Sequence, residues 1–223
     1  MALLAPILSM SDNEALERAA QELRGGSLVA FATDTVYGVG ALPMPEAARA
    51  LYEAKGRPQD KPLPLLLASA DLLPEYAENV PAVVRQLTSV YWPGPLTIVI
   101  PGKPEIARTL GARDGSVGIR VPEHPGLLRL LDLCGGALAV SSANRSGQDE
   151  VLSAWEAQEQ LGTHLALILD GGPSRNPFPS TVVDVRPSPP VILRAGPIAA
   201  GVKTLLQSPL TPKQTSTQEG SSA

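Results

Sequence analysis

The densest group of chemically active side chains lies at residues 55–62, with the sequence KGRPQDKP. Lys55, Arg57 and Lys61 place three cations on a short segment that contains two prolines. Cations on a restrained loop suit a polyphosphate, because they neutralise its negative charge. Cations at the end of a helix also complement the helix dipole, so this segment alone leaves both interpretations open.

Small hydroxyl-bearing and amide side chains recur beside predicted strands, at residues 33–35 (TDT), 141–144 (SSAN) and 180–181 (ST). Hydroxyl groups, amides and loop N–H groups bind phosphate and carboxylate oxygens. Open α/β sheets bind ligands at strand ends, which is where we place these loops. Ordinary turns use the same residue types, so no single loop identifies a site.

Two arginines are ambiguous when taken alone. Arg120, in VGIRV, faces away from its apolar neighbours and is either a surface charge or an inward carboxylate clamp. Arg194 follows the apolar strand at residues 191–193 and precedes a turn. Both positions are compatible with an anion-binding protein and do not name a reaction.

Several other catalytic schemes find no support. The chain contains neither a Walker P-loop nor a G-x-S-x-G nucleophile motif. Its two histidines lack metal-ligand spacing, and the single cysteine excludes an internal disulfide and a cysteine-rich zinc site. We therefore expect no protein side chain to bind a metal.

Hydrophobic periodicity places the polar segments between alternating helices and strands, which predicts a mixed α/β fold. The predicted helices cover residues 11–24, 45–54, 80–90, 125–133 and 153–161. The predicted strands cover residues 27–33, 63–68, 96–100, 117–121, 138–141, 166–169, 181–185 and 191–193.

Composition narrows the class of protein. The 223 residues predict one domain over 1–207, followed by a disordered polar tail at 208–223. A net charge of −4 argues against sequence-independent coating of nucleic acid. With one cysteine, no signal peptide and no apolar run long enough for a membrane span, we expect a cytoplasmic protein.

The combination of motifs is more specific than any one of them. The strings ATDTVYGVGA, LYEAKGRPQDKPL, YWPGPLTIVI, VGIRVPEHP, SSANRSG, ILDGG, STVVDV and VILRAGPI occur in this order. Together they resemble the threonylcarbamoyl-AMP synthase family of the YrdC/TsaC type, from about Ser11 to Ile198. The chain resembles the short members, which lack an extra C-terminal domain.

The resemblance implies a YrdC-like fold, a twisted mixed sheet surrounded by helices with a positively lined concave cavity. It implies a nucleotidyltransferase that forms threonylcarbamoyl-AMP and pyrophosphate from L-threonine, bicarbonate or CO2, and ATP. Mg2+ would accompany the ATP substrate. A transferase partner would then carry the threonylcarbamoyl group to adenosine 37 of tRNA.

The resemblance also assigns residues. The family's K-x-R and S-x-N signatures match Lys55 with Arg57 and Ser142 with Asn144, so these residues are expected to bind ATP, and Lys55 and Arg57 are expected to be catalytic. The expected ATP site also includes Lys61, Ser116 and Arg194. The expected threonine site comprises Thr35, Arg120 and Ser180.

One departure and two alternatives accompany the resemblance. Leu66 stands where some longer members carry a threonine-contacting histidine, so this chain must complete the amino-acid pocket in another way. One alternative is a module that binds double-stranded RNA or tRNA. The other is a paralogue with the same fold and a different carbamoyl-type activity.

Overall fold

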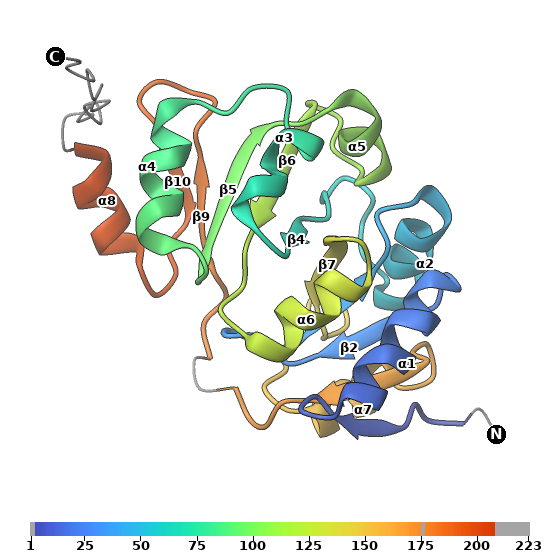
Figure 1. Cartoon of the computed structure of the whole chain (residues 1–223). Coiled ribbons are helices and arrows are strands. Elements are labelled where there is room, and N and C mark those ends of the chain that lie inside the picture. Colours follow the sequence, from blue (N-terminus) through green and yellow to red (C-terminus); the bar gives the residue numbers. More distant parts are fainter. Residues whose placement is uncertain (1–2, 175–176, 208–223) are drawn as a thin grey trace, which may run out of the picture.

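One ten-stranded mixed sheet runs through the computed structural model, which describes residues 3–174 and 177–207 (Figure 1). Its strands are β1 (Ile7–Ser9), β2 (Val29–Phe31), β3 (Gly38–Ala41), β4 (Leu65–Leu67), β5 (Leu96–Pro101), β6 (Ser116–Arg120), β7 (Ala137–Ser142), β8 (Leu167–Asp170), β9 (Thr181–Asp184) and β10 (Val191–Arg194). The helices are α1 (Asn13–Arg24), α2 (Pro45–Lys55), α3 (Leu73–Tyr76), α4 (Ala82–Tyr91), α5 (Pro104–Thr109), α6 (Pro125–Leu133), α7 (Ala154–Leu161) and α8 (Ala199–Gln207).

The strand order is β1-β8-β2-β3-β7-β4-β6-β5-β9-β10. Four pairs are parallel, namely β1 with β8, β2 with β8, β4 with β6, and β5 with β9. The other neighbours are antiparallel. The mixed α/β sheet that the sequence predicts is therefore confirmed.

Every predicted helix and strand is present, with its ends shifted by no more than about two residues. The predicted elements do not include the strands β1 and β3 or the helices α3, α5 and α8. β3 reads Gly-Val-Gly-Ala, and glycine is depleted in strands, so its sequence does not indicate one. The predicted tail at 208–223 lies outside the described residues, and the single-domain boundary stays a prediction.

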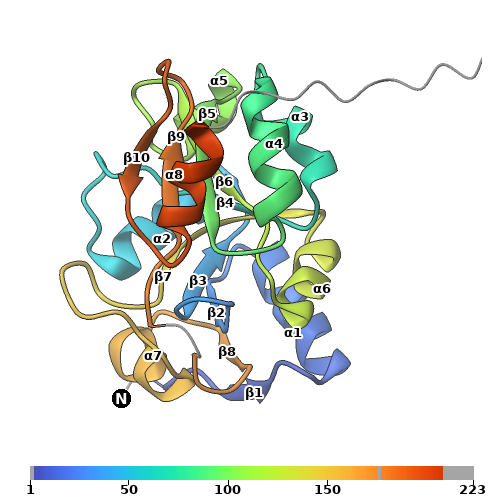
Figure 2. The same cartoon turned by 90° about the vertical axis from the view of Figure 1, so that its left-hand side faces the viewer.

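The two faces of the sheet differ in chemistry because side chains alternate along each strand. On β5 and β6, Ile98 and Ile119 are fully buried on one face. Helices α1, α4 and α6 lie along this side of the sheet (Figure 2). The alternate residues Thr97, Gly118 and Arg120 line a cavity on the other face. One face of the sheet thus packs in the hydrophobic core, and the other face forms a wall of the cavity.

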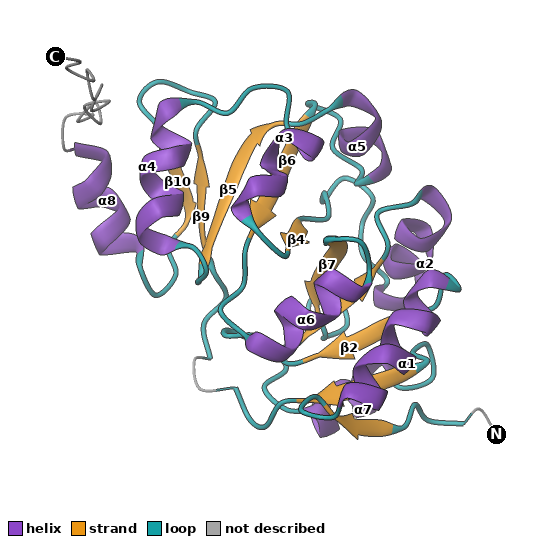
Figure 3. Cartoon of the chain, in the orientation of Figure 1, coloured by secondary structure: helices purple, strands orange, loops and turns teal. Residues whose placement is uncertain are grey.

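Helix ends are defined by local chemistry. Asp12 accepts a hydrogen bond from the backbone N–H of Glu14 and caps α1. Ser153 and Glu156 form a capping box at α7. Gly56 ends α2 with φ 58°, a left-handed conformation that glycine adopts without strain. The chain therefore turns sharply just before Arg57. Figure 3 shows how the helices and strands are distributed. Among the described residues no helix is long and apolar enough to cross a membrane.

Two glycines of β3 make room for an aromatic ring at the cavity wall. β2 and β3 pair so that Phe31 lies opposite Gly38. A Cβ atom built on Gly40 would lie 2.8 Å from Cε1 of Phe31, closer than van der Waals contact allows. Phe31 itself lines the cavity. Gly38 and Gly40 thus allow a fully buried ring to contribute to the cavity wall.

We expect Gly40→Ala to lower the free energy of unfolding by about 1–3 kcal/mol, because the new methyl group displaces the Phe31 ring. Gly118→Ala is the matched control, since the nearest atoms to its Cβ position are at an ordinary 3.5 Å. Denaturant titration measures both. Equal midpoints for the two variants would contradict this account of β3.

Candidate functional site

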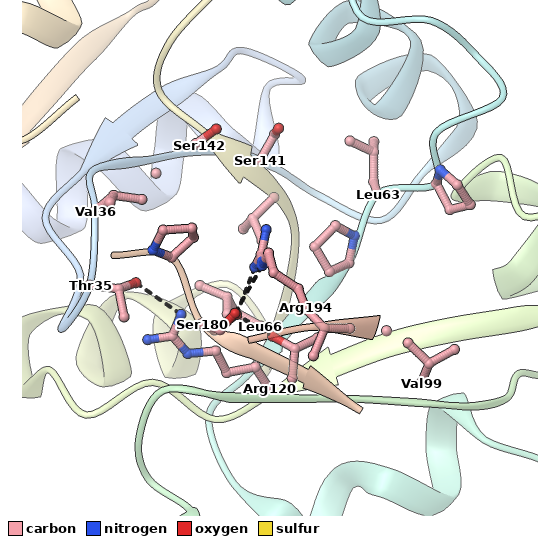
Figure 4. Close-up of a pocket in the computed structure, with 18 of the residues that line it drawn as sticks. Thr35, Val36, Leu63, Leu66, Val99, Arg120, Ser141, Ser142, Ser180 and Arg194 are labelled. Carbon is pink, nitrogen blue, oxygen red and sulfur yellow. Dashed lines mark hydrogen bonds between the residues drawn. The ribbon is translucent and has the colours of Figure 1, made fainter. Parts of the chain in front are cut away.

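A cavity of about 440 Å³ lies on the concave face of the sheet (Figure 4). Its size falls within the range of roughly 300–1,000 Å³ that is typical of small-molecule sites. Its walls come from β2, β3, β4, β5, β6, β7, β9 and β10 and from the loops between them. These strands are distant in sequence, so the residues of the site come together only when the chain folds.

The structure brings most of the predicted site residues together. Those that line the cavity are Thr35, Arg57, Ser116, Arg120, Ser142, Ser180 and Arg194. Lys55, Lys61 and Asn144 do not line it. The loop at 33–35 follows β2 and residues 141–142 end β7, as expected, whereas Ser180 directly precedes β9 and the cavity extends over a face of the sheet.

Lys55 is buried behind the cavity wall, at the end of α2. Its Nζ donates to the carbonyl oxygens of Ser142 and Asn144 and approaches Oδ1 of Asn144 at 3.4 Å. The Ser142 hydroxyl also donates to Oδ1 of Asn144. A charged ammonium has three donors, and these oxygens engage them. Lys55 therefore fixes the SSAN loop against α2.

Burial and, to a lesser extent, the neighbouring Arg57 charge lower the pKa of Lys55 to about 8. The carboxylate of Glu150 acts in the opposite direction. A rise in pH from 7 to 9 therefore removes the proton from Lys55, whereas an exposed lysine keeps its proton over this range.

Arg57 holds the loop that follows α2. Its Nε donates to the carbonyl of Lys61 at 3.0 Å, and one terminal nitrogen donates to the carbonyl of Pro62 at 3.0 Å. The guanidinium lines the cavity, whereas the Lys61 side chain is exposed outside it. Arg57 is therefore the member of this cationic segment that is placed to meet a ligand.

Arg120 points inward, which decides between the two interpretations of VGIRV. Its guanidinium is buried, donates to Oγ1 of Thr35 at 3.0 Å and to the carbonyl of Gly94 at 3.0 Å, and pairs with Asp34. These contacts use three of its five N–H groups, which leaves two for a ligand. Figure 4 shows Thr35 and Arg120 side by side on the cavity wall.

Arg194 and Ser180 form a second linked pair. Arg194 Nε donates to the Ser180 carbonyl at 2.9 Å, and a terminal nitrogen donates to Ser180 Oγ at 3.1 Å (Figure 4). The same hydroxyl shares a 2.7 Å hydrogen bond with Thr97. The expected ATP residue Arg194 and the expected threonine residue Ser180 are thus in direct contact.

Sequence reasoning missed a group of charged residues in the part of the cavity wall that lies next to β6 and β9. Ser116 donates to Asp114 Oδ1 at 2.7 Å, and Arg186 bridges Asp114 and Asp184 at 2.7 Å each. The Ser116 hydroxyl and then Arg186 lower the pKa of Asp114 to about 2. Arg186 follows β9, so its position after a strand was the available signal.

The cavity is cationic although the chain is acidic. Among the described residues its charged lining consists of Arg57, Arg120, Arg186 and Arg194 against Asp114 and Glu150. The chain as a whole carries a net charge of −4. Arg120 and Arg186 are paired with Asp34, Asp114 and Asp184. The positive charge that can attract an anionic ligand therefore lies on Arg57 and Arg194, which form no ion pair among the described residues.

Comparison with known proteins agrees with this geometry. The Sua5/YciO/YrdC family model, described as telomere recombination, matches residues 21–196. A threonylcarbamoyl-AMP synthase of Pyrococcus abyssi is 40% identical over 80% of this chain, and the match spans only 53% of that relative. A mouse threonylcarbamoyl-AMP synthase is 39% identical over 87% of this chain and 71% of the relative.

Solved structures support the same relationship. The crystal structure of Pyrococcus abyssi Sua5 complexed with L-threonine superposes with a TM-score of 0.86 at 36% identity, over 92% of this chain and 61% of that one. Escherichia coli YciO shares the fold with a TM-score of 0.76 at 23% identity, over 88% of this chain and 96% of that one. This chain belongs to the Sua5/YciO/YrdC family.

Proposed function

We propose that this protein is a nucleotidyltransferase that makes L-threonylcarbamoyl-AMP and pyrophosphate from L-threonine, bicarbonate or CO2, and ATP. The observation that carries the proposal is the convergence of Arg57, Ser142, Arg120 and Ser180 in one cationic cavity. A synthase must hold a nucleotide and an amino acid close together, and this cavity offers groups for both. The names of the relatives support the same activity.

The threonine end of the cavity is the wall around Arg120. Its two remaining N–H groups pair with the amino-acid carboxylate, as charge-assisted hydrogen bonds favour. Thr35 and Ser180 provide hydroxyls for the polar groups of the substrate. Leu66 contributes apolar surface here and is 5% exposed. A methyl group placed against apolar surface gains about 1–3 kcal/mol, which favours threonine over serine.

The nucleotide end is the wall around Arg57, Ser142 and Arg194. The threonine amine and CO2 give a carbamate, whose oxygen attacks the α-phosphorus of ATP while the bond to the β-phosphate oxygen breaks. Pyrophosphate leaves with the bonding electron pair. Such a step depends on placement and charge neutralisation rather than on a protein nucleophile. Mg2+ supplies further charge neutralisation when it is bound to the triphosphate.

The wider role follows from the same proposal. The product is a reactive mixed anhydride, so it is passed to a transferase partner that modifies adenosine 37 of tRNA. We place this reaction in the cytoplasm. Direct RNA binding is the competing proposal, and it requires phosphate contacts that respond steeply to salt.

We expect purified protein with ATP and Mg2+ to release pyrophosphate only when both L-threonine and bicarbonate are present. Both are needed because the attacking oxygen belongs to their carbamate. Omitting each in turn is the measurement. Release without threonine, or RNA binding without any release, would overturn the synthase assignment.

We expect Arg57→Ala to reduce kcat/KM for ATP by about 10- to 100-fold, since a hydrogen bond to a charged group contributes roughly 1.5–3 kcal/mol. Arg18→Ala removes an exposed arginine of α1 and serves as the control. Steady-state pyrophosphate release measures both. Equal kcat/KM values in the two variants would contradict the placement of Arg57 in the nucleotide site.

We expect ATP affinity to fall as pH rises through about 8, because Lys55 loses its proton there. The charge is fully present below this pH and absent well above it, so the positive field and one loop donor are lost together. Lys55→Met should bind ATP weakly with no break near pH 8, and the exposed Lys203→Met should keep the wild-type profile. A wild-type affinity that is flat from pH 7 to 9 would contradict this role.

A further inference from the structure

One acidic side chain lies in the part of the cavity where the proposed function places the triphosphate. Glu150 belongs to the loop between β7 and α7, and it lines the cavity together with Arg57, Ser142 and Arg194. Neither the sequence motifs nor the proposed chemistry gives this carboxylate a role. It is the residue of this wall that carries the same sign of charge as the substrate.

The Glu150 carboxylate is incompletely paired. Its Oε2 is buried and has no hydrogen-bond partner among the described residues. A buried carboxylate oxygen without a partner costs free energy, and the Glu150 residue lines the cavity, so this carboxylate points to a missing ligand. The missing partner must be a hydrogen-bond donor or a cation, because an ionised carboxylate only accepts.

The surroundings favour a cation that arrives with the nucleotide. Glu150 lines the same cavity as Arg194, and its charge raises the pKa of Lys55 and of Arg194, but it forms no ion pair with either among the described residues. A triphosphate bound at this wall would face the carboxylate and be repelled by it. A divalent cation between the two groups turns this repulsion into attraction.

The chemistry of the donor set fits magnesium. Mg2+ is commonly held by one or two carboxylates together with substrate phosphates and waters. No cluster of three or more His, Cys, Asp or Glu side chains in residues 3–174 and 177–207 could hold a metal by itself. A single carboxylate therefore requires the phosphate oxygens to complete the coordination sphere.

We propose that Glu150 is the protein ligand of the divalent cation that enters the cavity with the triphosphate, through Oε2. This inference rests on the proposed function and departs from the sequence expectation that no side chain binds a metal. It assigns the cation a fixed position on the β7–α7 loop, beside Ser142.

The test measures binding of α,β-methylene ATP by calorimetry, with Mg2+ or with EDTA, so that turnover plays no part. In the wild type, Mg2+ should strengthen binding by at least about tenfold, as expected for a close charge pair. Glu150→Gln should lose this gain and should bind the metal-free analogue more tightly than the wild type. Glu150→Asp should keep a gain from Mg2+.

Asp149→Asn is the matched control, because it removes one negative charge from the adjacent, exposed residue outside the cavity lining. It should keep the wild-type response to Mg2+. Bound Mn2+, detected by electron paramagnetic resonance with the same analogue, should be present in the wild type and Asp149→Asn and lost in Glu150→Gln.

An undiminished Mg2+ gain and retained Mn2+ in Glu150→Gln would overturn the inference while leaving the proposed function intact. If Glu150→Gln binds the metal-free analogue more tightly but keeps the full Mg2+ gain, Glu150 only repels the triphosphate and is not a metal ligand. This result would also overturn the inference. Absence of analogue binding in the wild type would overturn the proposed function and this inference with it.

Discussion

The site depends on one buried ammonium group. Lys55 places its Nζ among the carbonyls of Ser142 and Asn144 and the Asn144 side chain. It joins the end of α2 to the end of β7, two segments that are far apart in sequence. Removing it would leave buried carbonyl oxygens unpaired, and burying it lowers its pKa. This arrangement holds Arg57 and Ser142 on one wall.

The remaining chemistry follows from a sheet that presents different residues on its two faces. Helices cover the apolar face, so the other face is free to hold Thr97, Arg120 and Arg194. Arg57, Arg120 and Arg194 each donate to a hydroxyl or a backbone carbonyl, and Arg186 is held by two carboxylates, so none of these arginines is left flexible. Oriented charges need little rearrangement when a ligand arrives, which suits a reaction that depends on placement.

Sequence periodicity was sufficient for the main elements and for the mixed fold. It failed at β3, where two glycines accommodate the Phe31 ring. The strand propensity of a residue does not depend on the size of the side chain that packs against it, so it could not indicate this strand. The motif resemblance selected residues that mostly line one cavity. It did not indicate that Lys55 points behind the wall, since this direction depends on packing between α2 and the SSAN loop. No motif pointed to Glu150, because its role depends on a charge environment built by distant segments.

The central claim is that one cavity holds the nucleotide and the amino acid together. The most direct measurement is a crystal structure of the protein with α,β-methylene ATP and L-threonine. We predict the triphosphate beside Arg57 and Ser142 and the threonine carboxylate on Arg120, both on the concave face of the sheet. Density for either ligand at another surface, with this cavity empty, would contradict the account.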